Sequence, residues 1–146
     1  MAEHDDAVIS PTGWVAEQAK EYAESGGTRG TDVNGSPCLL LDYRGRTSGV
    51  WRRTVLIYGR DGEDYLVVAS KGGADEHPLW YLNLVAEPDV RVQVGPERFA
   101  ARAETLSTGQ KARVWPGLLD VYAPYADYQA KTERDIPVVR LRRAQG

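Results

Sequence analysis

Cysteine, histidine and long apolar runs are all scarce in this sequence. Cys38 is the single cysteine among 146 residues, which excludes an internal disulfide framework. His4 and His77 are the two histidines, so the chain lacks a set of soft ligands for zinc. The sequence therefore predicts no metal site.

Signals for membrane insertion and export are also missing. The longest unbroken apolar run, Tyr65 to Ala69, is far too short to span a membrane. The acidic N-terminus has neither the basic segment nor the apolar core of a signal peptide. A formal net charge of −3 argues against general nucleic-acid affinity, although the segment from Tyr43 to Arg60 holds five arginines and no acid. We expect a soluble cytoplasmic protein with no stable membrane insertion.

The length of the chain suits a single domain with one core. We expect a helix and loop over residues 1–37 and the strands of the domain over residues 38–146. The helix is predicted from Pro11 to Glu24, where apolar side chains recur at helical spacing and Gly26-Gly27 provides the stop. Residues 25–37 are predicted to be loop.

Short apolar segments separated by turn signals dominate the rest of the chain. The predicted strands are Cys38–Leu41, Thr54–Tyr58, Tyr65–Ala69, Val90–Val94, Arg98–Ala103 and Ile136–Leu141. Asp61-Gly62 and Gly95-Pro96 mark tight turns, and Ser107 with Gln110 forms a capping box that opens a helix ending near Asp120. About six strands without a strand–helix alternation predict an α+β, mainly β fold. We expect a small antiparallel barrel with covering helices rather than a doubly wound sheet.

One candidate anion site is the glycine-bounded segment Gly45-Arg46-Thr47-Ser48-Gly49, followed by Arg52 and Arg53. Glycines allow backbone N–H groups to turn inward, while hydroxyls and guanidiniums add further donors. Charge-assisted hydrogen bonds of about 1.5–3 kcal/mol each could hold a phosphate or an acidic chain there. The alternative is an ordinary solvated hairpin turn.

A second candidate lies in residues 69–83, where an apolar strand runs into Ser70-Lys71-Gly72-Gly73. Pro78 then suits a first helical turn, with Leu79, Leu82 and Asn83 predicted on one helix face. A cation, a flexible loop and a helix start together favour an anionic ligand beside an apolar wall. The alternative for Leu79 and Trp80 is core packing, and we interpret His77 as a helix-entry residue rather than a base.

Three tyrosines recur at a spacing of three in Tyr122, Tyr125 and Tyr128. If one helix carries them, they spread over one broad face and could line a single wall. Phenols stack on flat rings and donate protons, so the wall could face a substrate. The alternative is an aromatic helix face packed on the barrel.

Four parts of the sequence form a distinctive set. They are Gly45-Arg46-Thr47-Ser48-Gly49 with Arg52, the stretch from Ala69 to Leu84, the Glu87-Pro88-Asp89-Val90 segment, and the stretch from Tyr125 to Val139. Over residues 38–141 the set resembles the deazaflavin-dependent nitroreductases, the A-type branch of actinobacterial oxidoreductases that use coenzyme F420. The resemblance implies a split β-barrel of the flavin-binding type with the coenzyme in a groove between barrel and helices.

The resemblance also implies a role for individual residues. The tail of the coenzyme is expected to face Arg46, Thr47, Ser48, Arg52 and Lys71. Its ring and ribityl chain are expected to be surrounded by Leu56, Val68, Ala69, Ser70, Gly72, Leu79, Trp80 and Asn83. The acceptor pocket is expected to be shaped by Tyr122, Tyr125 and Tyr128, with Tyr125 and Ser70 as the catalytic pair that polarises or protonates the acceptor.

This chain departs from the family pattern at a few positions. Thr47 replaces a lysine or arginine, and Trp51 replaces a proline, so Arg53 is the expected substitute for the missing charge. Ile57 stands where other members have tyrosine or another polar residue, a change that bears on nitroimidazole activation more than on hydride transfer.

The resulting hypothesis is hydride transfer from reduced F420 to an electron-poor small molecule such as a quinone, an enone or a nitroaromatic. One alternative keeps the barrel but binds flavin mononucleotide or haem. Another is a non-catalytic carrier of F420. The expected assembly is a monomer or a weak homodimer.

Overall fold

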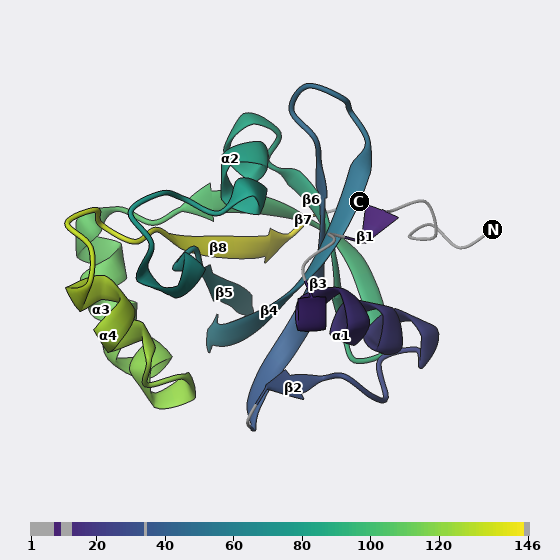
Figure 1. Cartoon of the computed structure of the whole chain (residues 1–146), viewed down its shortest axis with the longest axis horizontal. Helices are drawn as coiled ribbons and strands as arrows, with labels where there is room; N and C mark the ends of the chain where they lie inside the picture. Colours follow the sequence, from purple (N-terminus) through teal and green to yellow (C-terminus); the bar gives the residue numbers. More distant parts are fainter. Residues whose placement is uncertain (1–7, 10–12, 34, 145–146) are drawn as a thin grey trace.

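The centre of the protein is a closed barrel of antiparallel strands. The computed structural model describes residues 8–9, 13–33 and 35–144. The barrel strands are β3 (Ser36–Arg44), β4 (Trp51–Asp61), β5 (Asp64–Val68), β6 (Asp89–Val94), β7 (Glu97–Thr105) and β8 (Val138–Arg143). They pair in the order β3-β4-β5-β8-β7-β6, and β6 returns to β3 (Figure 1). This closure confirms the predicted α+β, mainly β split barrel of about six strands.

Two very short strands extend the barrel at its edges. β1 (Val8–Ile9) runs parallel to β4, and β2 (Asp32–Val33) runs antiparallel to the start of β3. The prediction that residues 25–37 form a loop is therefore wrong in part. The strand β2 and the first residues of β3 lie within this segment. The predicted boundary between residues 37 and 38 falls inside β3.

Four α-helices cover the barrel within the described residues. They are α1 (Gly13–Glu24), α2 (Leu79–Ala86), α3 (Thr108–Val121) and α4 (Tyr125–Ala130), and the single-turn 3-10 helix η1 (Lys71–Gly73) precedes α2. Figure 1 shows α3 and α4 together at one end of the molecule and α1 on the far side of β3 and β4. Among the residues that the structure describes, none of these helices is long and apolar enough to cross a membrane.

Apolar side chains fill the barrel and the spaces beneath the helices. The barrel cluster contains Leu39, Leu41, Val67, Val92 and Val139, all fully buried, and α2 adds Trp80, Tyr81 and Leu84. A second cluster, which includes Leu66, Val68, Leu118, Tyr125 and Ile136, joins β5 and β8 to α3 and α4. The packing thus anchors the tyrosine-bearing segment directly on the barrel wall.

The local signals at helix ends are confirmed. The Ser107 Oγ accepts a hydrogen bond from the Gln110 backbone N–H, and the Gln110 side chain accepts one from the Ser107 backbone N–H. At the end of α1, the Gly27 N–H donates to the Tyr22 carbonyl at 2.9 Å, and Gly27 has a φ of +83°. Of the predicted Pro11 to Glu24 helix, residues 11 and 12 lie outside the described residues.

One helical expectation is wrong, and another needs qualification. Tyr122 has an extended backbone at the end of α3, and α4 begins at Tyr125, so the three tyrosines come from two helices rather than one. Pro124, which lies between them, is the N-cap residue of α4. In α2, Leu79, Leu82 and Asn83 have the helical spacing predicted for one face, but Leu79 and Leu82 are 59% and 39% exposed while Asn83 is buried.

Candidate functional site

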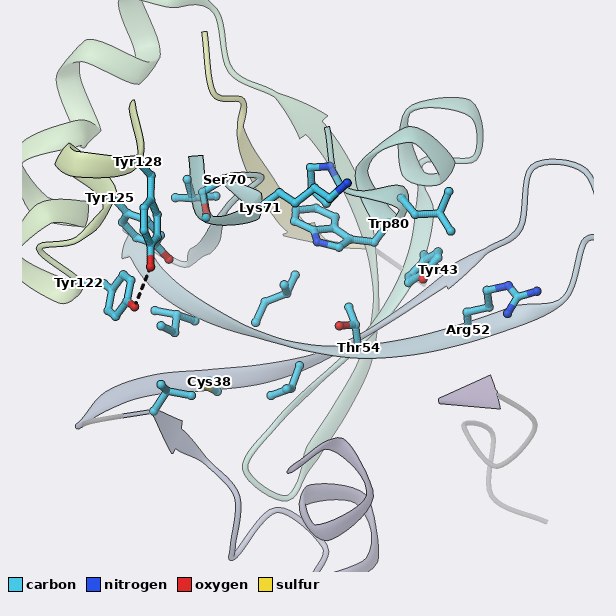
Figure 2. Close-up of a pocket in the computed structure, with 18 residues that line it drawn as sticks. Cys38, Tyr43, Arg52, Thr54, Ser70, Lys71, Trp80, Tyr122, Tyr125 and Tyr128 are labelled. Carbon is cyan, nitrogen blue, oxygen red and sulfur yellow. Dashed lines mark hydrogen bonds between the residues drawn. The ribbon is translucent and has the colours of Figure 1, made fainter. Parts of the chain in front are cut away.

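A cavity of about 630 Å³ runs along β4 between the barrel and the helices. Figure 2 shows Tyr122, Tyr125 and Tyr128 at one end of it and Arg52 with Tyr43 at the other. Ser70, Lys71 and Trp80 come from the segment above β4, and Thr54 comes from the strand itself. The cavity therefore has a phenolic end and a basic end.

Most of the predicted site residues line this one cavity. They are Arg52, Leu56, Val68, Ser70, Lys71, Gly72, Leu79, Trp80, Tyr122, Tyr125 and Tyr128. The cavity is also lined by Ile57, noted above as a departure from the family pattern, and by residues with no predicted site role, which are Val33, Cys38, Tyr43, Thr54, Val55 and Pro78. These belong to β2, β3, β4 and the entry of α2, and their apolar sequence patterns resemble ordinary core strands.

The glycine-bounded turn between β3 and β4 lies outside the cavity lining. Arg46, Thr47 and Ser48 are exposed in this turn. The Arg46 backbone N–H and its Nη1 both donate to Asn83 Oδ1, at 3.1 and 2.8 Å. Asn83, predicted to contact the coenzyme, instead lies buried in α2 and holds the turn to that helix.

Arg53, the expected substitute for the charge missing at Thr47, lies in a buried ion pair. Its side chain is 8% exposed, and its guanidinium donates to both oxygens of Asp42, at 2.7 and 2.9 Å. Asp42 and Arg53 are also paired residues in the β3–β4 ladder. Because neighbouring residues of a strand point to opposite faces, Arg52 faces the cavity and Arg53 faces away from it.

The Trp51 departure also has a structural role on this side of the strands. The Arg91 guanidinium carbon lies 3.9 Å from the centre of the Trp51 ring, and that of Arg44 lies 5.4 Å from it. A cation over an indole face is an attractive arrangement. The tryptophan therefore links the turn end of the β3–β4 hairpin, at Arg44, to Arg91 of β6.

The lysine turn has an unusual backbone. Lys71, Gly72 and Gly73 have φ values of +47°, +64° and +85°, and Lys71 is the one non-glycine residue with positive φ in the described part of the chain. A Cβ on Gly73 would lie 2.7 Å from the Tyr128 carbonyl oxygen, so glycine permits the turn to pack on α4. The Lys71 Nζ lies 3.3 Å from Glu76 Oε1.

Arg134, between α4 and β8, holds the segment that carries this turn. Its guanidinium donates to the carbonyl oxygens of Ala69, Ser70 and Ala74 and contacts His77 Nδ1. Burial and the neighbouring guanidinium lower the pKa of His77. His77 therefore accepts a hydrogen bond as a neutral ring, which agrees with its interpretation as a helix-entry residue.

Sequence reasoning missed Arg134. An isolated arginine between a short helix and a strand has the pattern of an ordinary exposed residue. Ala69, another predicted coenzyme contact, is fully buried and presents its carbonyl oxygen to Arg134 rather than its side chain to the cavity.

The three tyrosines meet although two helices carry them. Their ring centres lie 5.0 to 6.4 Å apart, in tilted or edge-on arrangements. The hydroxyls of Tyr122 and Tyr128 share a hydrogen bond of 3.2 Å (Figure 2). Within the described residues, the Tyr125 hydroxyl has no hydrogen-bond partner. It is therefore the phenol of this cluster whose hydroxyl is not engaged by another side chain.

The surroundings raise the pKa of two of these phenols. The pKa of Tyr125 is raised, mainly by burial and then by the neighbouring Tyr122. The hydrogen bond with Tyr122, followed by burial, raises the pKa of Tyr128 to about 12. Burial also raises the pKa of the Cys38 thiol to about 12. Tyr125 and Tyr128 therefore keep their phenolic protons at neutral pH.

The comparison with known protein families agrees with this arrangement. A family model for F420H2-dependent quinone reductases matches residues 14–143. The chain belongs to this family. Family membership confirms the predicted deazaflavin resemblance, the reductase class and the coenzyme F420, whereas nitroreductase and ene-reductase activities stay predictions.

Relatives of this quinone reductase family are similar over most of the chain. An F420H2-dependent quinone reductase of Mycobacterium tuberculosis strain H37Rv is 43% identical over 126 residues, which is 84% of this chain and 85% of the relative. A solved F420-H2 dependent reductase, FDR-A, is 38% identical with a TM-score of 0.68, covering 72% of this chain and 93% of its own. Another solved chain, described as a domain-swapped dimer, is 39% identical with a TM-score of 0.70, covering 90% of this chain and 99% of its own.

Proposed function

We propose that this protein reduces a quinone with reduced F420, and that both molecules occupy the cavity along β4. The observation that carries the proposal is the Tyr125 hydroxyl, which lines the same cavity as Lys71 and Arg52 and has no partner among the described residues. A cavity of about 630 Å³ is in the size range of small-molecule and cofactor sites.

The residues of the cavity fit the coenzyme. Arg52 and Lys71 offer two cations for its anionic tail, while Leu56, Val68 and Trp80 offer apolar surface for its flat ring. Gly72 leaves room beside Lys71, since a Cβ there would meet no atom within 4 Å. Binding at this position would cover Leu79, an apolar side chain that is otherwise 59% exposed.

The phenolic end fits the acceptor. The coenzyme supplies the hydride, and this chain must then orient the quinone and stabilise the negative charge that develops on its oxygen. The Tyr125 hydroxyl donates a hydrogen bond to that oxygen, assisted by the Ser70 hydroxyl. Such a donor contributes about 2.7–4 kcal/mol to a transition state of this kind. The raised pKa of Tyr125 keeps its proton available over the whole neutral range.

The rings of Tyr122 and Tyr128 pack against the ring of Tyr125. One of these two hydroxyls donates to the other, and both rings offer aromatic surface that a flat acceptor can contact. The lining of the cavity also includes the apolar side chains of Val33, Cys38 and Ile57. A quinone with an apolar ring or substituent is therefore a better acceptor for this pocket than a charged one.

The experiment that tests the function mixes purified protein with chemically reduced F420 and menadione without oxygen. Return of the visible absorbance of oxidised F420, at a rate proportional to protein concentration, is the expected result. Binding of F420 without turnover by any quinone would indicate a carrier instead. Absence of F420 binding, with bound flavin mononucleotide or haem in the isolated protein, would overturn the proposal in favour of the other barrel class.

We also infer a monomer or a weak homodimer located in the cytoplasm. The inference rests on the sequence, and a relative described as a domain-swapped dimer makes the assembly worth measuring. Sedimentation across a hundredfold range of protein concentration distinguishes a monomer from a dimer.

A further inference from the structure

We infer that Arg134 is a positioning residue that holds the Ser70 hydroxyl and the Lys71 ammonium in place for the reaction. The inference rests on the proposed function, because it concerns the same cavity. Arg134 itself does not line that cavity, so its effect would pass through the residues that it binds.

The guanidinium of Arg134 uses both of its terminal nitrogens and Nε. Nη2 donates to the Ser70 carbonyl at 2.7 Å, and Nη1 donates to the Ala69 carbonyl at 3.1 Å. Nε donates to the Ala74 carbonyl at 2.7 Å, and Nη1 also lies 3.1 Å from His77 Nδ1. These acceptors lie on both sides of the Lys71 to Gly73 turn, so one side chain joins its two ends.

The turn needs such a restraint because its backbone is unfavourable. Lys71 has a left-handed backbone, with φ of +47°, which costs free energy for a residue with a Cβ. The conformation persists only where the surroundings impose it. Within η1, the Gly73 N–H donates to the Ser70 carbonyl, and the same carbonyl oxygen accepts from Arg134. Loss of the guanidinium would therefore release the residue that begins the turn.

Arg134 also fixes the turn relative to the tyrosine helix. Its own carbonyl accepts a hydrogen bond of 2.8 Å from Gln129 Nε2, and Gln129 belongs to α4 with Tyr125. Thr132 Oγ1 donates to Asp75 at 2.9 Å, which adds a second link between the two segments. The two hydroxyls proposed to act on the quinone, on Ser70 and Tyr125, thus depend on one connected set of contacts.

A planar guanidinium suits this task and an ammonium does not. The donors of arginine have a fixed fork geometry, whereas those of lysine radiate from one point on a flexible stem. A lysine at position 134 could satisfy the carbonyls on one side of the turn but not those on both. Arg134→Lys therefore retains the charge and removes the link.

The test compares Arg134→Lys with Arg142→Lys as a matched control. Arg142 is an exposed arginine of β8 whose Nε lies 3.8 Å from Asp64, and it does not line the cavity. The first measurement is the rate of trypsin cleavage between Lys71 and Gly72, followed by mass spectrometry without coenzyme. The second is the dissociation constant for oxidised F420 by fluorescence, and the third is kcat with menadione.

We expect Arg134→Lys to speed cleavage after Lys71 and to weaken F420 binding, each by about tenfold, as loss of charge-assisted bonds implies. We also expect kcat to fall by about a further tenfold, beyond the loss of F420 affinity. The midpoint of urea unfolding should stay near that of the wild type. Added methylguanidinium should restore part of the loss in Arg134→Ala. Arg142→Lys should match the wild type in all three measurements.

Wild-type cleavage, F420 affinity and kcat in a folded Arg134→Lys protein would overturn the inference. If Arg134→Lys does not fold, His77→Ala removes one acceptor and leaves the rest of the turn intact. That variant should speed cleavage after Lys71 at least twofold, and an unchanged cleavage rate would count against the inference. Failure of the proposed function would give a different result. The wild-type protein would then neither bind nor oxidise reduced F420, while Arg134→Lys would still be cleaved after Lys71 faster than the wild type.

Discussion

Removal of the Tyr125 hydroxyl is the most direct perturbation of the proposed chemistry. In Tyr125→Phe the ring keeps its packing, with its centre 5.0 Å from Tyr122 and 6.3 Å from Trp115. The hydroxyl has no hydrogen-bond partner within the described residues, so the folded state loses no hydrogen bond there. We therefore expect the free energy of unfolding to change by less than about 0.5 kcal/mol.

The effect on the reaction should be much larger. A donor aimed at a developing oxyanion contributes about 2.7–4 kcal/mol, which corresponds to about a hundredfold to a thousandfold loss of kcat. Ser70 remains as the second hydroxyl, so we expect a loss near the lower figure. The dissociation constant for F420 should stay within about twofold of the wild type, since Tyr125 lies at the end of the cavity opposite Arg52.

The assay follows anaerobic oxidation of reduced F420 at saturating coenzyme, with several quinones to exclude an effect of one acceptor. Tyr58→Phe is a matched control, because Tyr58 is a partly buried phenol of β4 that packs edge-on against Tyr65 outside the cavity. Urea unfolding of both variants checks the fold. We expect Tyr58→Phe to retain the wild-type kcat.

A Tyr125→Phe enzyme that retains more than a third of the wild-type kcat with every quinone would refute the reasoning. The same conclusion would follow if Tyr128→Phe, which lacks one of the two mutually bonded hydroxyls, lost more activity than Tyr125→Phe. Either result would mean that the free hydroxyl in the cavity is not the group that meets the acceptor oxygen.

Three further predictions concern stability, coenzyme binding and thiol reactivity. Tyr22→Phe should lower the free energy of unfolding in urea by about 1–3 kcal/mol, because the buried Tyr22 hydroxyl accepts from the Gly95 N–H at 2.7 Å; an unchanged value would contradict this. Glu76→Gln should tighten F420 binding by up to about fivefold by releasing Lys71 from an exposed ion pair, and weaker binding would argue against that competition. With its pKa raised to about 12, the Cys38 thiol should react with N-ethylmaleimide at pH 8 about a thousandfold more slowly than in urea-unfolded protein, and comparable rates would show that the thiol is accessible.

The fold was largely predictable because its signals are local. Each barrel strand coincides with an apolar segment, and the turns at Gly62 and Gly95 lie where glycine signals predicted them, both with positive φ. The pairing of β3 with both β4 and β6, which closes the barrel, could be predicted only from the fold class and the family resemblance. No short segment of sequence specifies which distant strands pair.

The site was less predictable, because it depends on the register of β4 and on which residues bind one another across the fold. Arg52 and Arg53 are adjacent and chemically identical, yet one faces the cavity and the other binds Asp42. Their orientation depends on strand register, which the sequence alone does not give when both faces of β4 are covered. Asn83 fits a coenzyme contact by residue type, and only the position of α2 beside the hairpin turn gives it to Arg46 instead.

The placement of β8 affects how the protein is made. This strand follows every other barrel strand in the sequence, yet it lies between β5 and β7 and pairs with both. A ribosome must therefore release residues 138–143 before the barrel can close, and a nascent chain that ends earlier exposes two unpaired strand edges. The cavity depends on the same closure, because its lining residue Val68 of β5 pairs with Val138 of β8. We therefore expect coenzyme binding to require a chain that includes β8.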